Sequence, residues 1–205
     1  MCLLQGPSWP IPVNTAYVFG RALGDYESDE RDTGLLEFAA NLYKYGQVES
    51  ISVPGYNPQT RDGYTDYPGG TTWRELLERM MVPRHRIFLT SGEKRPQHTR
   101  SDGDEFIETA RGRGWTQAII ITNPHQMLRA MLGLIISMRE QGYQLKLYAC
   151  VLPRVDWHKP VYGSQGQKRL PRHEHIREEW ERISKYQATG DIASLEELRS
   201  YLLSL

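Results

Sequence analysis

Five short runs of β-branched and apolar residues, each followed by a stretch with helical spacing, limit the folds open to this 205-residue chain. A strand that is apolar on both sides must be covered on both faces, and strands that alternate with helices form parallel sheets. We therefore expect a three-layer α/β/α fold with a mainly parallel, Rossmann-like sheet. The expected strands lie at 15–20, 50–55, 85–90, 118–122 and 145–151.

The apolar residues between and after these runs recur at three- and four-residue intervals, which is typical of amphipathic helices. Ser101 is followed three residues later by Asp104, a spacing that predicts a capping box at the start of one helix. The expected helices lie at 33–46, 71–81, 102–113, 124–141, 174–188 and 194–204.

Two segments interrupt this alternation and are interpreted as long loops. Residues 55–72 are rich in Gly, Pro, Tyr and Asp, and residues 152–173 are basic. Loops of this length are uncommon in compact domains unless they bind something or are disordered. We expect a Rossmann-like domain over 1–151, a basic loop over 152–173 that could close as a lid, and a C-terminal helical extension of the same domain over 174–205.

Composition narrows the class of protein. Hydrophobic residues make up 39% of the chain and charged residues 24%, and the formal net charge is +0. A neutral chain has no overall field that attracts nucleic acid, so we expect no nucleic-acid partner. No run is long enough to span a bilayer and no signal peptide is evident, which predicts a soluble, cytoplasmic protein with an undetermined oligomeric state.

The stretch AIIITNPHQMLRAM combines the end of an expected strand with the start of a helix. Asn123 could cap that helix, and exposed backbone N–H groups at a helix start favour an anion. His125 and Arg129 are four residues apart and share one helical face, and Thr122 precedes them. The pattern predicts an anion site, although a surface histidine beside a well-capped helix would give the same pattern.

Three other segments could supply ligands at the same edge of the sheet, where the carboxyl ends of parallel strands meet. They are the glycine turn after the first strand, the basic loop after the third strand, and the Gly-rich turn GSQGQKR. The glycine turn could instead be a plain strand-to-helix turn, and the other two could be solvated surface loops. The candidate ligand-binding residues in them are Gly20, Arg21, Thr99, Arg100, Lys168 and Arg169.

The chain resembles the YdcF/SanA/ElyC-like family of domains of unknown function over about residues 14–151. Its members share a strand with V-x-G, a loop containing threonine, and a T-x-x-x-H-x-x-R-A motif. The resemblance implies a Rossmann-like fold with a polar site at the strand ends, and one member is linked to S-adenosylmethionine. The corresponding residues are Gly20, Thr99, Thr122, His125, Arg129 and Ala130, and in this chain the motif is spaced T-x-x-H-x-x-x-R-A.

The leading hypothesis is a protein that binds a small anionic metabolite, containing phosphate or a nucleotide, at this edge. If it is an enzyme, phosphate-ester or nucleotide chemistry fits, with His125 as acid or base and Arg129 stabilising developing charge. His173-x-His175 lacks a third ligand, so no metal is expected.

Two alternatives stay open. The first is non-catalytic binding of S-adenosylmethionine or a nucleotide. The second is a protein-interaction module that presents an exposed apolar stripe formed by Trp180, Ile183 and Leu198.

Overall fold

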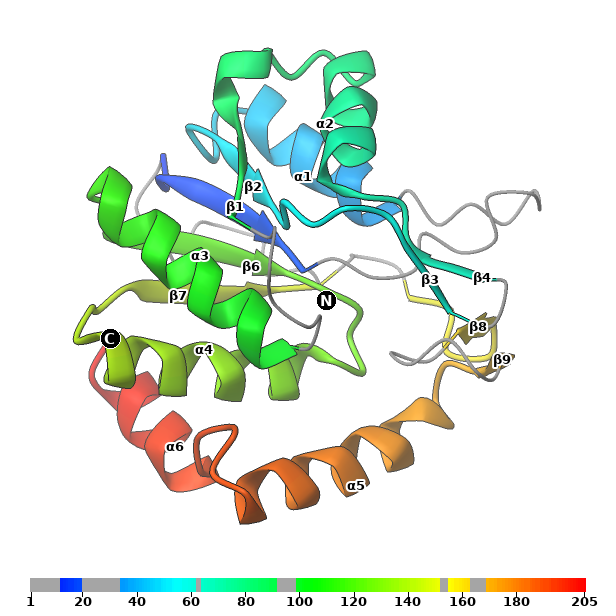
Figure 1. Ribbon diagram of the computed structural model, residues 1–205, viewed down its shortest axis with the longest axis vertical. Coiled ribbons are helices and arrows are strands. Elements are labelled where there is room, and N and C mark those ends of the chain that lie inside the picture. The colour runs from blue at the N-terminus through cyan, green and yellow to red at the C-terminus, as the bar shows by residue number, and fades with distance from the viewer. Residues whose placement is uncertain (1–11, 20–33, 62–63, 92–98, 152–154, 163–168) are drawn as a thin grey trace.

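The computed structural model describes residues 12–19, 34–61, 64–91, 99–151, 155–162 and 169–205. Within these residues a five-stranded parallel sheet lies between two layers of helices (Figure 1), which confirms the predicted α/β/α, Rossmann-like fold. The strand order is β5-β2-β1-β6-β7. The strands are β1 (Thr15–Val18), β2 (Ile51–Val53), β5 (Ile87–Leu89), β6 (Gln117–Ile121) and β7 (Lys146–Cys150). Each lies inside one of the five predicted runs, except that β6 begins one residue earlier than predicted.

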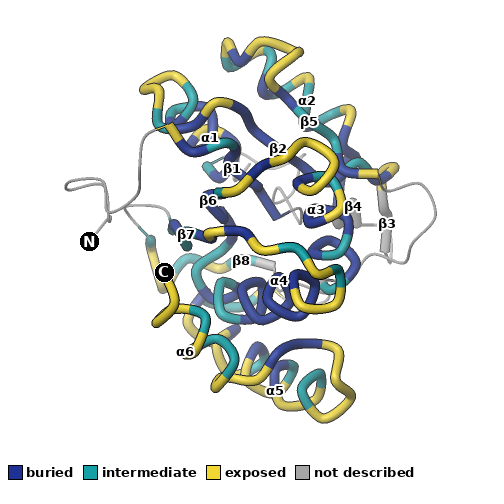
Figure 2. The backbone as a smooth tube through the Cα atoms, turned by 90° about the vertical axis from the view of Figure 1, so that its left-hand side faces the viewer, coloured by how far each residue is buried: buried dark blue, intermediate teal, exposed yellow. Residues whose placement is uncertain are grey.

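Side-chain alternation along the strands produces two separate cores, one on each face of the sheet. Ala16 and Val18 of β1 join the core under α1 (Gly34–Lys44) and α2 (Gly70–Arg79). Tyr17 joins the opposite core under α3 (Thr99–Arg113) and α4 (Met127–Gln141), where its ring stacks on Phe106 at 4.1 Å. Both faces of the central strands are therefore buried, as Figure 2 shows. Because neither face contacts water, these strands have a nearly continuous apolar sequence.

Both predicted long loops contain short secondary structure. Residues 55–72 include an antiparallel pair, β3 (Gln59–Arg61) and β4 (Tyr64–Tyr67), and a 3-10 turn, η1 (Arg84–Arg86), precedes β5. Residues 152–173 include a second antiparallel pair, β8 (Pro160–Tyr162) and β9 (Arg169–Pro171). These strands have three or four residues each, too few for an alternating pattern to reveal them in the sequence.

Two predictions about helix starts are wrong. Ser101 and Asp104 lie inside α3, which begins at Thr99, so they do not form a capping box at its start. α4 begins at Met127 rather than at residue 124, because the residues before it form a turn. Among the described residues a capping box forms at α6, where Ser194 and Glu197 exchange side-chain and backbone hydrogen bonds.

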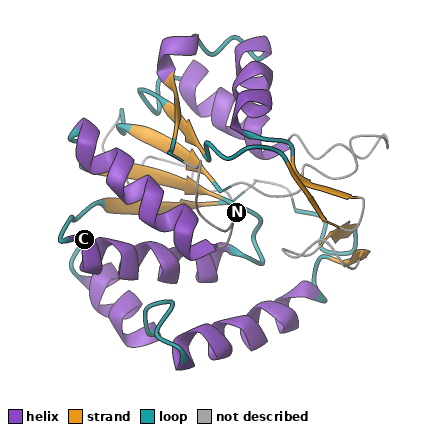
Figure 3. Ribbon diagram, in the orientation of Figure 1, coloured by secondary structure: helices purple, strands orange, loops and turns teal. Residues whose placement is uncertain are grey.

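The C-terminal extension consists of α5 (His175–Ala188) and α6 (Leu195–Leu203), which pack against the outer side of α4 (Figure 3). Ile183 is 3% exposed and Leu198 packs against the same core as α4. Only Trp180 of the predicted apolar stripe is well exposed, so the stripe does not form as predicted. Among the described helices, none is long and apolar enough to cross a lipid bilayer.

Tyr201 of α6 forms hydrogen bonds with backbone groups at the outer edge of β7, the last strand of the sheet. Its hydroxyl accepts a hydrogen bond from Leu147 N at 2.6 Å and donates one to Leu145 O at 2.8 Å. We expect Tyr201→Phe to lower the free energy of unfolding by about 1–3 kcal/mol, because both backbone groups lose their partner. Urea denaturation measures this change, and Tyr45→Phe, at a position 78% exposed, should leave the midpoint unchanged.

Candidate functional site

The chain leaves the two central strands in opposite directions. β1 leads to α1 on one face of the sheet, whereas its neighbour β6 leads to α4 on the other face. In open parallel sheets, ligands bind outside the carboxyl ends of the strands at such a switch point. The residues that follow β6, from Thr122 onward, therefore lie where this fold ordinarily binds a ligand.

A tight turn joins β6 to α4. The backbone N–H of Gln126 donates to Asn123 O at 2.9 Å, and Thr122 Oγ1 donates to Gln126 Oε1 at 3.3 Å. Gln126 occupies the cap position of α4, and no side chain caps that end of the helix. The predicted capping role of Asn123 is therefore wrong, because Asn123 starts the turn through its carbonyl group.

His125 lies within this turn and is 7% exposed. Neither ring nitrogen has a hydrogen-bond partner among the described residues. Burial lowers the pKa of His125 to about 4; the carboxylate of Glu179 opposes this, and His175, Arg172 and Arg129 add to it. At neutral pH the ring is therefore uncharged, with one N–H to donate and one nitrogen lone pair to accept a proton or a hydrogen bond.

Arg129, one turn further along α4, is paired with a carboxylate of α5. Its Nε donates to Glu179 Oε2 at 2.5 Å and its Nη2 to Glu179 Oε1 at 3.2 Å, and the two side chains are only 6% and 3% exposed. Arg182 donates to Glu179 as well, at 2.6 Å. Burial would raise the pKa of Glu179, but the two guanidinium groups lower it below the usual value.

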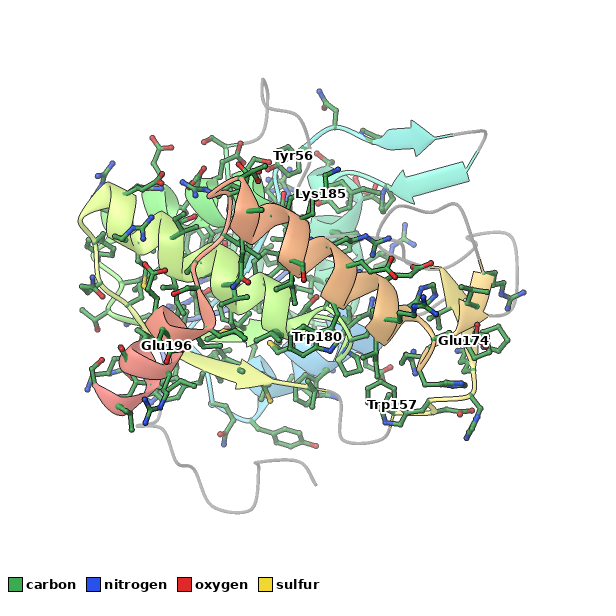
Figure 4. The ribbon with its side chains drawn as sticks, turned by 90° about the horizontal axis from the view of Figure 1, so that it is seen from below. Tyr56, Trp157, Glu174, Trp180, Lys185 and Glu196 are labelled. Carbon is green, nitrogen blue, oxygen red and sulfur yellow. The ribbon has the colours of Figure 1, made fainter. Side chains whose placement is uncertain are left out.

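His175, the first residue of α5, completes the site and was not predicted to be part of it. Its ring is fully buried, and the ring centroids of His125 and His175 are 5.4 Å apart. We refer to His125, Arg129, His175 and Glu179 as the histidine cluster. Figure 4 looks onto α5, which follows Glu174 and carries Trp180 and Lys185, and α5 is joined to α4 by the Arg129–Glu179 ion pair.

Arg100, predicted to bind an anion, is instead held in a network of ion pairs between helices. Its Nε lies 3.0 Å from Asp104 Oδ1, its Nη2 donates to Glu140 of α4, and its Nη1 donates to Asp191 O at 3.4 Å. Because each nitrogen of the guanidinium faces an oxygen of the protein, Arg100 ties α3, α4 and the α5–α6 turn together. The structure does not bring it into contact with the histidine cluster.

The structure describes only some of the remaining residues that were predicted to bind a ligand. Thr99 is the first residue of α3, and its side chain is not described; Arg169 is an exposed residue of β9. Gly20, Arg21 and Lys168 lie outside the described residues.

A second buried polar group, unpredicted from the sequence, lies at the ends of β2 and β5. Thr90 Oγ1 accepts from Gly55 N at 3.3 Å and donates to Glu105 Oε2 at 3.4 Å. Asp102 and Glu105 are 3% and 2% exposed. Burial, reinforced by the charge of Asp102, raises the pKa of the Tyr56 hydroxyl. This acidic group is buried beside the carboxyl ends of β2 and β5.

Across the described part of the chain, no three His, Cys, Asp or Glu side chains are placed to share a metal ion. No protein-family model matches the chain, and no curated protein matches it.

Two solved structures are similar to it at 12% identity. One is a universal stress protein from Archaeoglobus fulgidus, with a TM-score of 0.37 over 68% of this chain and 94% of that one. The other is a pantoate-beta-alanine (pantothenate synthetase) structure from Thermus thermophilus, with a TM-score of 0.41 over 97% of this chain and 78% of that one. These similarities assign no ligand or reaction to this chain.

Proposed function

We propose that the protein binds a small anionic metabolite, containing phosphate or a nucleotide, beside His125 at the carboxyl edge of the sheet. The observation that carries the proposal is the buried His125 ring, whose two nitrogens have no partner among the described residues. Buried polar groups are almost always hydrogen-bonded, so an unpaired one at a switch point is best explained by a ligand. The resemblance to the YdcF/SanA/ElyC-like family agrees with a site at this edge.

The charges around His125 define how such a ligand would be held. Arg129 is matched by Glu179, so its guanidinium contributes less free positive charge than the sequence pattern suggests. A neutral His125 donates its N–H to an anion oxygen, and Arg172 adds positive charge nearby. If turnover occurs, the uncharged ring serves as the base that accepts a proton from the attacking group, in phosphate-ester or nucleotide chemistry.

Non-catalytic binding of S-adenosylmethionine or a nucleotide is the second candidate. One observation favours it: the Arg129 charge is already compensated by Glu179. S-adenosylmethionine carries no phosphate and needs less positive charge around it than a phosphate dianion does. The two candidates differ in whether His125 is needed for turnover or only for binding.

Calorimetric titration with inorganic sulfate, inorganic phosphate, nucleotides and S-adenosylmethionine tests the proposal. We expect one of these to bind, and His125→Gln to weaken that binding at least about tenfold, the equivalent of one lost hydrogen bond. Sulfate keeps its charge over the working pH range, so its affinity should rise as pH falls from about 7 toward 5, because a bound anion favours the protonated His125 ring.

The exposed His158 provides the matched control, and His158→Gln should bind as the unchanged protein does. Binding without turnover that survives His125→Gln would favour the second candidate. A panel with no binding at all, or equal affinity at each pH and in both variants, contradicts the anion site.

A further inference from the structure

The strand β5 forms one edge of the main sheet, because β2 is its only neighbour in the strand order. Thr90 N donates to Val53 O, so the backbone groups of even-numbered residues face β2 and those of Ile87 and Leu89 face outward. Ile87 N is bound to Arg84 O within η1. Ile87 O, Leu89 N and Leu89 O have no hydrogen-bond partner among the described residues, which leaves one edge of β5 available to a further strand.

The guanidinium group of Arg113, the last residue of α3, lies beside β5. Its Cζ atom is 3.7 Å from the centroid of the Phe88 ring and 6.0 Å from that of Trp115. Stacking on an aromatic face restricts the side chain and leaves the N–H groups in the guanidinium plane able to donate. No carboxylate in the described part of the chain is paired with Arg113, whereas Arg84 is paired with Glu78 at 3.1 Å.

Arg113 also lines an open pocket of about 490 Å³, together with Thr109, Gly112 and Trp115. Sites for metabolites and cofactors usually enclose most of their ligand, whereas this pocket is wide open to solvent. It therefore suits a side chain of a partner that lies on the surface better than a free small molecule. Trp115 precedes β6 and the histidine cluster follows β6, so the pocket is at the opposite end of the sheet from the proposed ligand site.

The charge of this edge decides which partner fits it. Arg86, directly before β5, is exposed like Arg113, and neither has a carboxylate partner among the described residues. Glu108 is the one acidic residue in the last two turns of α3, and it is paired with neither arginine. A second copy of the chain would bring the same arginines against this edge, and like charges across paired strands are unfavourable. An acidic strand is attracted instead.

We propose that the outer edge of β5 binds an acidic, extended segment of another protein, which adds to the sheet as a strand. In this mode of recognition, main-chain hydrogen bonds provide affinity and pockets for side chains provide specificity. The residue opposite Phe88 on the added strand points to the same face of the sheet, so its carboxylate meets the guanidinium stacked on Phe88. This docking site does not depend on the proposed anion binding beside His125.

Fluorescence anisotropy with a labelled short peptide of alternating Glu and Val residues tests the proposal at neutral pH. We expect it to bind with a Kd between about 10 μM and 1 mM. The same peptide with every backbone amide N-methylated keeps its charges but cannot pair as a strand, and a peptide of alternating Lys and Val pairs but has the wrong charge. Both should bind at least about tenfold more weakly, which corresponds to the loss of one charged hydrogen bond or more.

Variants of the protein locate the binding. Arg113→Glu should weaken binding of the Glu-Val peptide at least about tenfold, because it reverses the charge that meets the carboxylate. Arg177→Glu, at a position 89% exposed on α5, is the matched control and should bind as the unchanged protein does. On saturation with peptide, the amide exchange of Leu89 should slow about tenfold.

Three results would overturn the docking site. They are no binding of the Glu-Val peptide up to about 1 mM, equal affinity for the N-methylated peptide, and equal affinity in Arg113→Glu. Unchanged exchange of Leu89 in the saturated complex would likewise show that the peptide does not add to β5.

Discussion

Arg129→Ala is expected to destabilise the protein by about 3–5 kcal/mol, the largest effect of any single substitution considered for this chain. The variant removes one of the two guanidinium groups paired with the Glu179 carboxylate, which is 3% exposed. Removing one partner of a buried ion pair costs far more than the pair contributes, because the other charge stays away from water. Urea denaturation of both proteins at neutral pH measures the difference.

Replacing both partners separates this explanation from simple loss of packing. Arg129→Met with Glu179→Leu removes both charges but keeps apolar volume, and we expect it to recover most of the stability lost in Arg129→Ala. Arg139→Ala is the surface control: its ion pair with Glu197 is half exposed, so it should change stability by less than about 1 kcal/mol. If the double variant is as unstable as Arg129→Ala, the uncompensated charge is not the cause.

The second large effect is acid destabilisation through His125. Its pKa is about 4 in the folded protein and 6.5 in an exposed histidine, so between these values the unfolded chain binds more protons than the folded one. Stability from the neutral ring is therefore fully present above pH 6.5 and is lost as pH falls toward 4. The difference in pKa corresponds to about 3 kcal/mol.

His125→Gln removes the titrating ring, so the free energy of unfolding of this variant relative to the unchanged protein should improve by about 3 kcal/mol between about pH 7 and pH 4. Other titrating groups cancel in that comparison. His158→Gln should show no such relative change with pH. A constant difference between the unchanged protein and His125→Gln across this range would mean that His125 ionises normally.

The sheet and its helices could be predicted from the sequence because their patterns are local. Each buried strand is a run of β-branched residues, such as AIII at 118–121, and each run is followed by a helical pattern. The start of α4 was predicted at residue 124 instead of Met127, because Asn-Pro is also typical of the start of a helix. Local patterns place elements well and their first turns less well.

The histidine cluster could be predicted only in part. The sequence placed His125 and Arg129 on one helical turn, but the partner of Arg129 is fifty residues away in the chain. His175 was considered only as a metal ligand, and its contact with Val161 depends on a three-residue strand. His175 and Glu179 are four residues apart on one helix, and this spacing could have indicated that an acidic residue faces the same site.

The separation of Arg129 and Glu179 along the chain affects how the protein folds during synthesis. All five strands of the main sheet and the four helices between them lie before residue 151, yet Arg129 is buried against a carboxylate at residue 179 and β7 against the hydroxyl of Tyr201. A nascent chain that ended before α5 would lack the Glu179 carboxylate that pairs with the buried Arg129 and the Tyr201 hydroxyl that binds the edge of β7. The segment that forms α5 and α6 must therefore leave the ribosome before the native state gains these two contacts.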